Sequence, residues 1–195
     1  NTNPDKIIIS SFDCTDENTE KKLSLLAEEL GGVNLLVLSA GRGDLNENLE
    51  YHIEEETNLL NVNAFTKIVS WAFKYFEIKK EGHLAAITSI AGIRGGRQSP
   101  AYNASKAYQI NYLEGLRQKA ERAQLPIFIT DVRPGFVATA MAKGEGQFWV
   151  APPEKAARQI FEIIKKKKGI AYVTRRWWLI GMLLKTIPNG LFKKF

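Results

Sequence analysis

Five short apolar segments, separated by longer segments with helical spacing, constrain the fold of this chain more than any other feature of its sequence. The apolar segments are residues 6–12, 33–39, 83–89, 126–132 and 169–174. Several of them are apolar without interruption, which is typical of parallel strands buried on both faces of a sheet. The segments with helical spacing are residues 17–30, 51–79, 101–123 and 153–167.

This alternation of strand and helix predicts the α/β class, with a doubly wound parallel sheet between two layers of helices. A length of 195 residues and a hydrophobic content of 45% are sufficient for one buried core. No linker and no internal repeat divides the chain. We therefore expect one domain over residues 1–174, followed by a tail over residues 175–195.

Cysteine content and charge exclude several classes of protein. The lone cysteine, Cys14, cannot form an intrachain disulfide, and no Cys/His cluster has the spacing of a zinc site. No secretory signal and no run of about 18 apolar residues occurs, so we expect a cytoplasmic protein without a metal site. Residues 165–195 hold nine of the 27 basic residues and no acid, which leaves 18 basic against 21 acidic residues elsewhere. A nucleic-acid-binding fold usually has a more widely spread basic face.

Small and polar side chains follow the predicted strands, at the edge where ligands bind in such sheets. They are Asp13, Cys14 and Thr15; Ser39, Ala40 and Gly41; Thr88 and Ser89; and Arg133, Pro134 and Gly135. On the helix after Ser89, Tyr102 and Lys106 lie one turn apart and share a face. A nearby ammonium lowers the pKa of a phenol, so this pair can move a proton to or from a substrate oxygen held by the Ser89 hydroxyl.

The spacing Tyr-x-x-x-Lys is weak evidence alone, because it occurs again at Tyr75 and Lys79. The copy at Tyr102 differs in context: Ser89 ends a strand thirteen residues earlier, and the three residues inside the motif are small. We interpret Tyr75 and Lys79 as helix surface.

Together these residues resemble the short-chain dehydrogenase/reductase family over about residues 6–174. Ser89, Tyr102 and Lys106 match its catalytic serine and its Tyr-x-x-x-Lys motif, here YNASK. Asn61, in NVNA, matches the asparagine that completes the family's tetrad by holding a water beside the lysine. A buried asparagine that satisfies a helix kink is the alternative for this residue. The resemblance implies a Rossmann-like sheet and proton transfer by Tyr102.

The resemblance also implies a nicotinamide cofactor, either NAD(H) or NADP(H). The residues that match the family's cofactor contacts are Asp13 and Cys14 in DCTD, Ser39, Ala40 and Gly41, Pro134, Gly135, Val137 and Thr139, and Tyr102 and Lys106 themselves. Asp13 matches the acid at the adenine ring, although it can instead cap the following helix. Cys14 can instead be a small packed residue.

The sequence departs from the family pattern at three points. Ser39 replaces the usual asparagine of the family's Asn-Ala-Gly segment, and Ala64 stands where a glycine often follows the tetrad asparagine. The glycine-rich TGxxxGxG loop, which cradles the pyrophosphate after the first strand, is absent. The resemblance therefore implies a sheet that lacks its first two strands.

We expect an NAD(P)-dependent oxidoreductase that transfers hydride between the cofactor and a carbonyl or secondary alcohol, with Tyr102 as general acid or base. The alternative is a dinucleotide-binding regulatory or scaffold protein of the same fold, although a binder needs no tuned tyrosine. Apolar residues in the loop 136–150 suit a bulky or lipid-like substrate. Family members often form homo-oligomers, and nucleic acid is not an expected partner because no aromatic-lined sheet face accompanies the basic tail.

The tail contains about 13 residues of helix-compatible sequence, 175–187, before Pro188. Its tryptophans, leucines and flanking basic residues fit a helix that lies in a membrane interface, and the segment is too short to span a bilayer. Packing on the domain or on a second subunit is the alternative. The sequence leaves both open.

Overall fold

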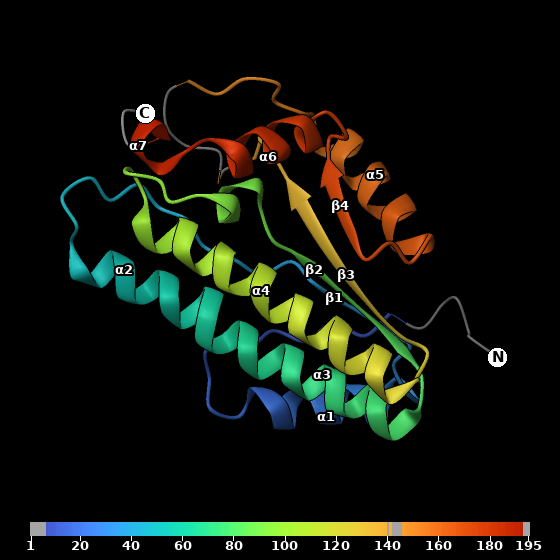
Figure 1. Cartoon of the computed structure of the whole chain (residues 1–195). Helices are drawn as coiled ribbons and strands as arrows, with labels where there is room; N and C mark the ends of the chain where they lie inside the picture. Colours follow the sequence, from blue (N-terminus) through green and yellow to red (C-terminus); the bar gives the residue numbers. More distant parts are fainter. Residues whose placement is uncertain (1–6, 140, 142–145, 193–195) are drawn as a thin grey trace.

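The computed structural model describes residues 7–139, 141 and 146–192, in which helices and strands alternate along the chain (Figure 1). The strands are β1 (Leu35–Leu38), β2 (Gly82–Ile87), β3 (Ile127–Pro134) and β4 (Ile170–Val173). The α-helices are α1 (Thr19–Glu29), α2 (Tyr51–Asn58), α3 (Phe65–Lys79), α4 (Pro100–Ala123), α5 (Pro153–Lys165), α6 (Trp177–Thr186) and α7 (Asn189–Phe192). A π-helix, η1 (Leu59–Ala64), joins α2 to α3, and a 3-10 helix, η2 (Ile90–Ile93), follows β2.

The four strands form one parallel sheet in the order β1-β2-β3-β4. Because the strands are parallel, their carboxyl ends meet at a single edge, at the top of the sheet in Figure 1. The central strands β2 and β3 are buried along most of their length, which explains why their sequences are apolar without interruption.

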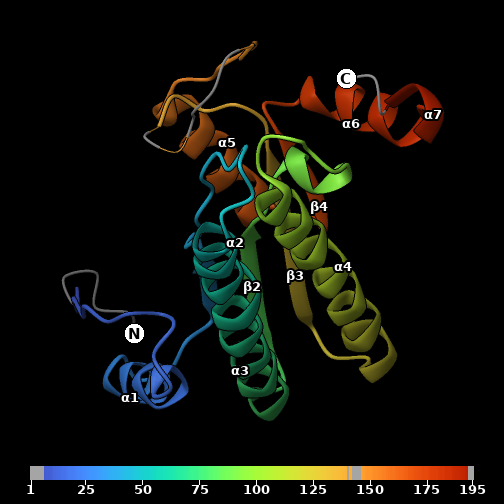
Figure 2. The same ribbon diagram turned by 90° about the vertical axis from the view of Figure 1, so that its left-hand side faces the viewer.

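Helices cover both faces of this sheet. Successive residues of β3 point to opposite faces: Ile127 and Ile129 join the core beneath α3 and α4, whereas Val132 joins a smaller cluster beneath α5. Helix α1 lies against α3, outside the sheet (Figure 2). The predicted α/β class, with a doubly wound parallel sheet in three layers, is confirmed.

The strand expected over residues 6–12 does not form. Residues 7–12 have no regular secondary structure, and the side chains of Ile7 and Ile9 are 83% and 90% exposed. Residue 6 lies outside the described part of the chain. A strand needs a hydrogen-bonded neighbour and a covered face, and the described residues offer this segment neither. An apolar sequence alone therefore predicted the wrong local structure.

The tail forms two short helices, α6 and α7, within the described residues up to 192. Helix α6 contacts β4 and η2, so it lies near the carboxyl edge of the sheet. Within the described ranges, the structure contains no helix with the length and apolar character required to cross a membrane.

The core between α3 and the sheet yields a test of the fold. Phe76 is 1% exposed, and a Cβ atom at Gly82 of β2 would lie 2.1 Å from its ring. We expect Phe76→Ala to lower the free energy of unfolding by about 3–5 kcal/mol, because it leaves a cavity in a close-packed core. Ile78→Ala on the same helix is the matched control, since Ile78 is 83% exposed. Equal denaturant midpoints for the two variants would contradict this account of the core.

Candidate active site

Ser89 lies two residues beyond β2, at the carboxyl edge of the sheet, and its side chain is buried. Its backbone is extended, with φ −170° and ψ 156°, and it precedes the first residue of η2. The Ala91 amide donates a hydrogen bond to Ser89 Oγ at 3.1 Å. This bond caps η2 and fixes the direction of the hydroxyl group.

Tyr102 lies in the first turn of α4, and its phenol is close enough to the Ser89 side chain for that hydroxyl to act on its pKa. Burial raises the pKa of the phenol, and the neighbouring Ser89 hydroxyl opposes that rise. The expected lowering of this pKa by Lys106 is therefore wrong in direction. Loss of water around the ring is the larger cause of the shift, and the Lys106 Nζ lies 5.8 Å from the ring centroid. The phenol keeps its proton at neutral pH.

The N-terminus of α4 is held by a carboxylate from another helix. Ser99 precedes α4 but makes no side-chain capping bond. Instead, the Ala101 amide donates to Glu54 Oε2 at 3.0 Å, and Asn46 Nδ2 donates to Glu54 Oε1 at 2.7 Å. Negative charge is favourable at a helix N-terminus. Glu54 thus fixes the turn of α4 that carries Tyr102.

Lys106 is buried one turn after Tyr102. Its Nζ donates to the Ile87 carbonyl at 3.2 Å and to Gln109 Oε1 at 3.0 Å. Burial lowers the pKa of this ammonium to about 8, and the negative charge of Asp131 opposes the change. An ammonium has three donors. With these two acceptors among the described residues, one N–H remains for a ligand hydroxyl.

Asp131, which belongs to a buried ion pair on β3, supplies the negative charge near Lys106. Arg133 donates from Nε and Nη2 to Asp131 Oδ2 at 2.8 and 2.6 Å. Thr88 Oγ1 donates to Asp131 Oδ1 at 2.6 Å. Buried charges are tolerated when they are paired and hydrogen-bonded in this way. The pair also fixes Thr88, the residue next to Ser89.

Asn61 lies fully buried in the π-helix η1. Its Oδ1 accepts from the Arg42 amide at 2.9 Å, and its Nδ2 donates to the Arg42 carbonyl at 2.6 Å and to Ser105 Oγ at 3.0 Å. Gln109 Nε2 donates to the Asn61 backbone carbonyl at 2.8 Å. The Gln109 side chain therefore bridges the Asn61 backbone carbonyl and the Lys106 ammonium. A single π-helical turn between α-helices frequently lies at a functional site.

The loop after β1 approaches the same side chains with glycines. A Cβ atom at Gly41 would lie 3.3 Å from Lys106 Nζ, and one at Gly43 would lie 2.6 Å from Tyr102 Cδ2. Ser39 and Ala40, which precede Gly41, are exposed. The loop therefore places backbone, without a side chain, against Tyr102 and Lys106.

The other predicted cofactor segment follows β3. A Cβ atom at Gly135 would lie 2.0 Å from the Trp177 ring, so this position accepts no side chain. Val137 forms a bridge with Ala151, and this pairing closes the base of the loop that follows. Pro134 ends β3 and is half-buried, whereas Thr139 is exposed.

Aromatic residues of this loop gather around α6. The Trp177 ring lies 5.5 Å from Phe136, 5.0 Å from Phe148 and 6.0 Å from Trp149, measured between centroids. Met141, which also belongs to the loop, is exposed. The loop after β3 and the first turn of α6 therefore form one apolar wall.

Arg94, just after η2, anchors the far end of the same helix. Its Nε donates to the Leu184 carbonyl and its Nη1 to Asn189 Oδ1, both at 2.8 Å, and its Nη2 donates to the Ile187 carbonyl. Asn103, next to Tyr102, holds the backbone of Arg94 through a bond to its carbonyl at 3.0 Å. The segment after Ser89 is thus tied to α6 and α7.

Asp13 and Cys14 lie in the segment before α1. Asp13 Oδ1 accepts from the amide and hydroxyl of Thr15 at 2.8 and 2.7 Å, and the bond from the amide is the main reason why the pKa of this carboxyl is lowered. Asp13 does not cap α1, which begins at Thr19. Cys14 packs against the core, and burial raises the pKa of its thiol. A cofactor role for either residue stays a prediction.

The second Tyr-x-x-x-Lys pair has a structural role. Tyr75 OH accepts from the Val33 amide at 3.1 Å, and Lys79 Nζ donates to the Val33 carbonyl at 3.0 Å. The pair therefore fastens α3 to the segment before β1, and it is more than plain helix surface.

The structure brings Ser89, Tyr102, Lys106 and Asn61 into one network. Sequence reasoning did not predict the supporting roles of three residues, namely Gln109, Glu54 and Arg94. Gln109 is detectable in principle, because it follows Lys106 by three residues on one helix face. Glu54 and Arg94 act on segments far away in the sequence, so no local spacing reveals them.

Comparisons with known proteins agree with this arrangement. The chain matches the family described as short chain dehydrogenase over residues 1–148. An uncharacterized oxidoreductase of Mycobacterium tuberculosis is 29% identical over 198 residues, covering 97% of this chain and 77% of the relative. One from Myxococcus xanthus is 28% identical over 180 residues, covering 89% and 70%.

Solved structures share the fold at low sequence identity. A bulky-bulky ketone specific alcohol dehydrogenase from Comamonas testosteroni gives a TM-score of 0.69 at 18% identity, covering 91% of this chain and 72% of the other. The protein ElxO, solved with NADP bound, gives 0.67 at 19% identity, covering 83% and 74%. The match over most of the chain confirms the expectation from the sequence: this chain belongs to the short-chain dehydrogenase family of oxidoreductases.

Proposed function

We propose that the chain interconverts a carbonyl and an alcohol with a nicotinamide cofactor, and that Tyr102 moves the proton. The observation that carries the proposal is the buried network in which Ser89, Tyr102, Lys106 and Asn61 are joined by hydrogen bonds and contacts. A regulatory or scaffold protein has no need for an ammonium held in the interior beside a phenol, since burial of that charge costs free energy. The network therefore favours an enzyme.

The two hydroxyl groups have distinct tasks. The Ser89 hydroxyl lies near the Tyr102 phenol, so a carbonyl oxygen placed near one of them also meets the other. Because burial keeps the phenol protonated, Tyr102 donates its proton to that oxygen during reduction. The Lys106 ammonium stabilises the phenolate that remains, and Gln109 holds the ammonium in place.

The residues present suit the nicotinamide end of a cofactor. Lys106 has an N–H available for a ribose hydroxyl. Gly41 lies beside this ammonium and has no side chain that would block a ligand there. Pro134 ends β3, and Gly135, Val137 and Thr139 follow it at the same edge of the sheet. The bound cofactor would supply or accept the hydride. ElxO, with its bound NADP, supports NADP(H) as one candidate, and NAD(H) is the other.

The substrate class follows from the apolar wall. Phe136, Phe148, Trp149 and Trp177 form an apolar cluster on the loop that follows β3, at the same edge of the sheet as Ser89, which suits a bulky apolar carbonyl compound. The Comamonas enzyme, named for bulky ketones, supports the same class. A homo-oligomer stays a prediction.

Removal of the phenol hydroxyl tests the proton donor. Tyr102→Phe keeps the ring but removes the transferable proton, so we expect kcat to fall by about 10²-fold or more. NAD(P)H oxidation with a panel of bulky ketones and aldehydes measures the effect. Tyr75→Phe is the matched control, because it removes a hydroxyl outside the network. Equal rates for Tyr102→Phe and the unchanged chain would contradict the proposal.

The pH profile of carbonyl reduction tests the state of Lys106. Above a pH of about 8 the ammonium loses its proton, because burial disfavours the charged form. The phenolate formed by proton donation then loses its stabilising charge, so we expect kcat to decrease as pH rises through about 8. A profile that stays flat from neutral pH to about 10 would show that the charge of Lys106 has no part in the reaction.

Substitution of Gln109 tests its link to Lys106. Gln109→Leu removes an acceptor that favours the ammonium, so we expect the alkaline decrease of kcat to move to lower pH. Gln109→Glu places a carboxylate there, so the decrease should move to higher pH. Gln118→Leu, exposed on the same helix, is the control. If the alkaline decrease of kcat moves in the same direction in both Gln109 variants, Gln109 acts only through packing and the link to the Lys106 charge is contradicted.

A further inference from the structure

Helix α6 presents a row of large apolar side chains to solvent. Trp178, Leu179, Met182 and Leu183 are 52%, 58%, 44% and 55% exposed, and their spacing places them on one face of the helix. The opposite face is buried at Trp177 and Gly181. A soluble monomer rarely exposes so many adjacent apolar residues without a binding role.

This outward face cannot turn inward without breaking contacts at both ends of α6. Trp177 is 2% exposed within the aromatic cluster of the loop after β3. At the other end, Arg94 donates hydrogen bonds to the carbonyls of Leu184 and Ile187. The helix is therefore fixed on the body of the protein, with its apolar row facing out.

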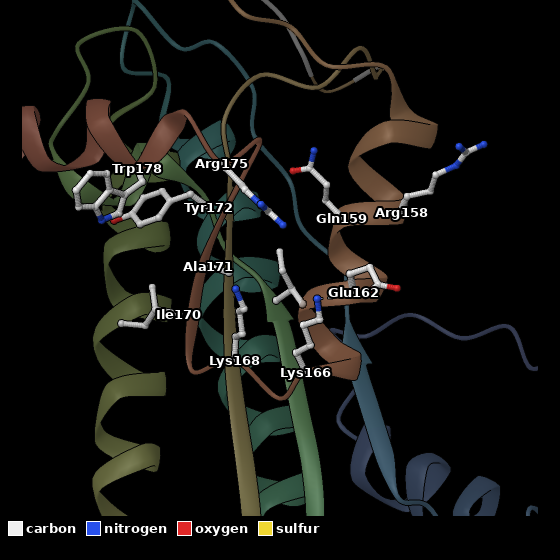
Figure 3. Close-up of a pocket in the computed structure, with 11 residues that line it drawn as sticks. Arg158, Gln159, Glu162, Lys166, Lys168, Ile170, Ala171, Tyr172, Arg175 and Trp178 are labelled. Carbon is white, nitrogen blue, oxygen red and sulfur yellow. Dashed lines mark ion pairs between the residues drawn. The ribbon is translucent and has the colours of Figure 1, made fainter.

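A basic pocket lies beside this row, between α5 and β4, with a volume of about 460 Å³ (Figure 3). Lys166, Lys168 and Arg175 direct their nitrogen atoms towards one another in it. Among the described residues that line the pocket, Glu162 is the one acid, and it forms an ion pair with Lys166 at 3.7 Å. Trp178 belongs both to the pocket and to the exposed row, so the two surfaces are continuous.

Converging like charges repel one another, and an anion between them relieves that repulsion. The adjoining row is apolar, and the segment from residue 165 to the end of the sequence holds no acid. A second copy of the same surface would bring these cations face to face, which is unfavourable. The combination of an anion site with an apolar helix face matches a bilayer that contains anionic lipids.

We propose that the outward face of α6 and the basic pocket together dock on the surface of an anionic membrane. Trp178, Leu179 and Leu183 enter the interface, and a lipid phosphate group occupies the space between Lys168 and Arg175. With ten residues, α6 is too short to cross the hydrocarbon core, so it lies along the surface. Docking then holds the apolar wall of the proposed active site close to the lipid phase. Membrane binding itself does not depend on catalysis.

Flotation of the full chain with vesicles tests the proposal. We expect binding to vesicles of phosphatidylcholine with phosphatidylglycerol, weaker binding to phosphatidylcholine alone, and release at high salt because the charges are screened. Leu179→Ser with Leu183→Ser should weaken binding about tenfold or more, since two side chains lose their transfer into the interface. Lys168→Gln with Arg175→Gln should weaken binding at low salt and have little effect at high salt.

Two controls match these variants. Ile78→Ser removes an apolar side chain that is 83% exposed on α3, and Lys21→Gln removes an exposed charge on α1; neither should change binding. Circular dichroism checks that every variant is folded. Failure of the unchanged chain to bind anionic vesicles, or equal binding by the leucine variant, overturns the proposal. A dimer in sedimentation that the leucine variant dissociates, without vesicle binding, would make this face a subunit interface instead.

Discussion

A positive charge kept in the interior of the fold is the constraint on which the rest of the site depends. Lys106 is 3% exposed, so its ammonium must find its partners within the protein. The end of β2 supplies one through the Ile87 carbonyl, and the helix itself supplies another through Gln109. Asp131, one partner of the ion pair on β3, adds a negative charge nearby. Sheet, helix and ion pair must therefore be correctly placed at the same time for the charge to be tolerated.

Sequence reasoning predicted the parts of this arrangement that depend on local pattern. Apolar runs and helical spacing identified the four strands of the sheet and the long helices, because each pattern reflects the faces that an element buries. The same reasoning failed for residues 6–12, since a strand also requires a neighbour, and the identity of a neighbour is not a local property. Ser89, Tyr102 and Lys106 were predicted as site residues because fixed spacings join them, and the structure places their side chains close together.

The supporting residues were missed for a different physical reason. Glu54 caps a helix that begins 46 residues later in the sequence, and Arg94 holds carbonyls about 90 residues away. Such bonds arise from the way in which elements are packed, and any exposed acid or arginine has the same local signature. The direction of the Tyr102 pKa was misjudged likewise, because the sequence reveals the charged neighbour but not the loss of water around the ring.

The contact between Gly135 and Trp177 has a consequence for the way this chain can change over generations. Any side chain at position 135 would overlap the indole, whose nearest atom lies 2.0 Å from the site of a Cβ atom. A smaller residue at position 177 would remove the overlap but would also break the cluster with Phe136 and Phe148. The two positions are thus epistatic: a replacement at 135 becomes tolerable only after one at 177, and the intermediate has already loosened the wall beside the site. Geometry therefore fixes the order of substitutions: as long as Trp177 keeps its indole, no other residue is tolerated at position 135.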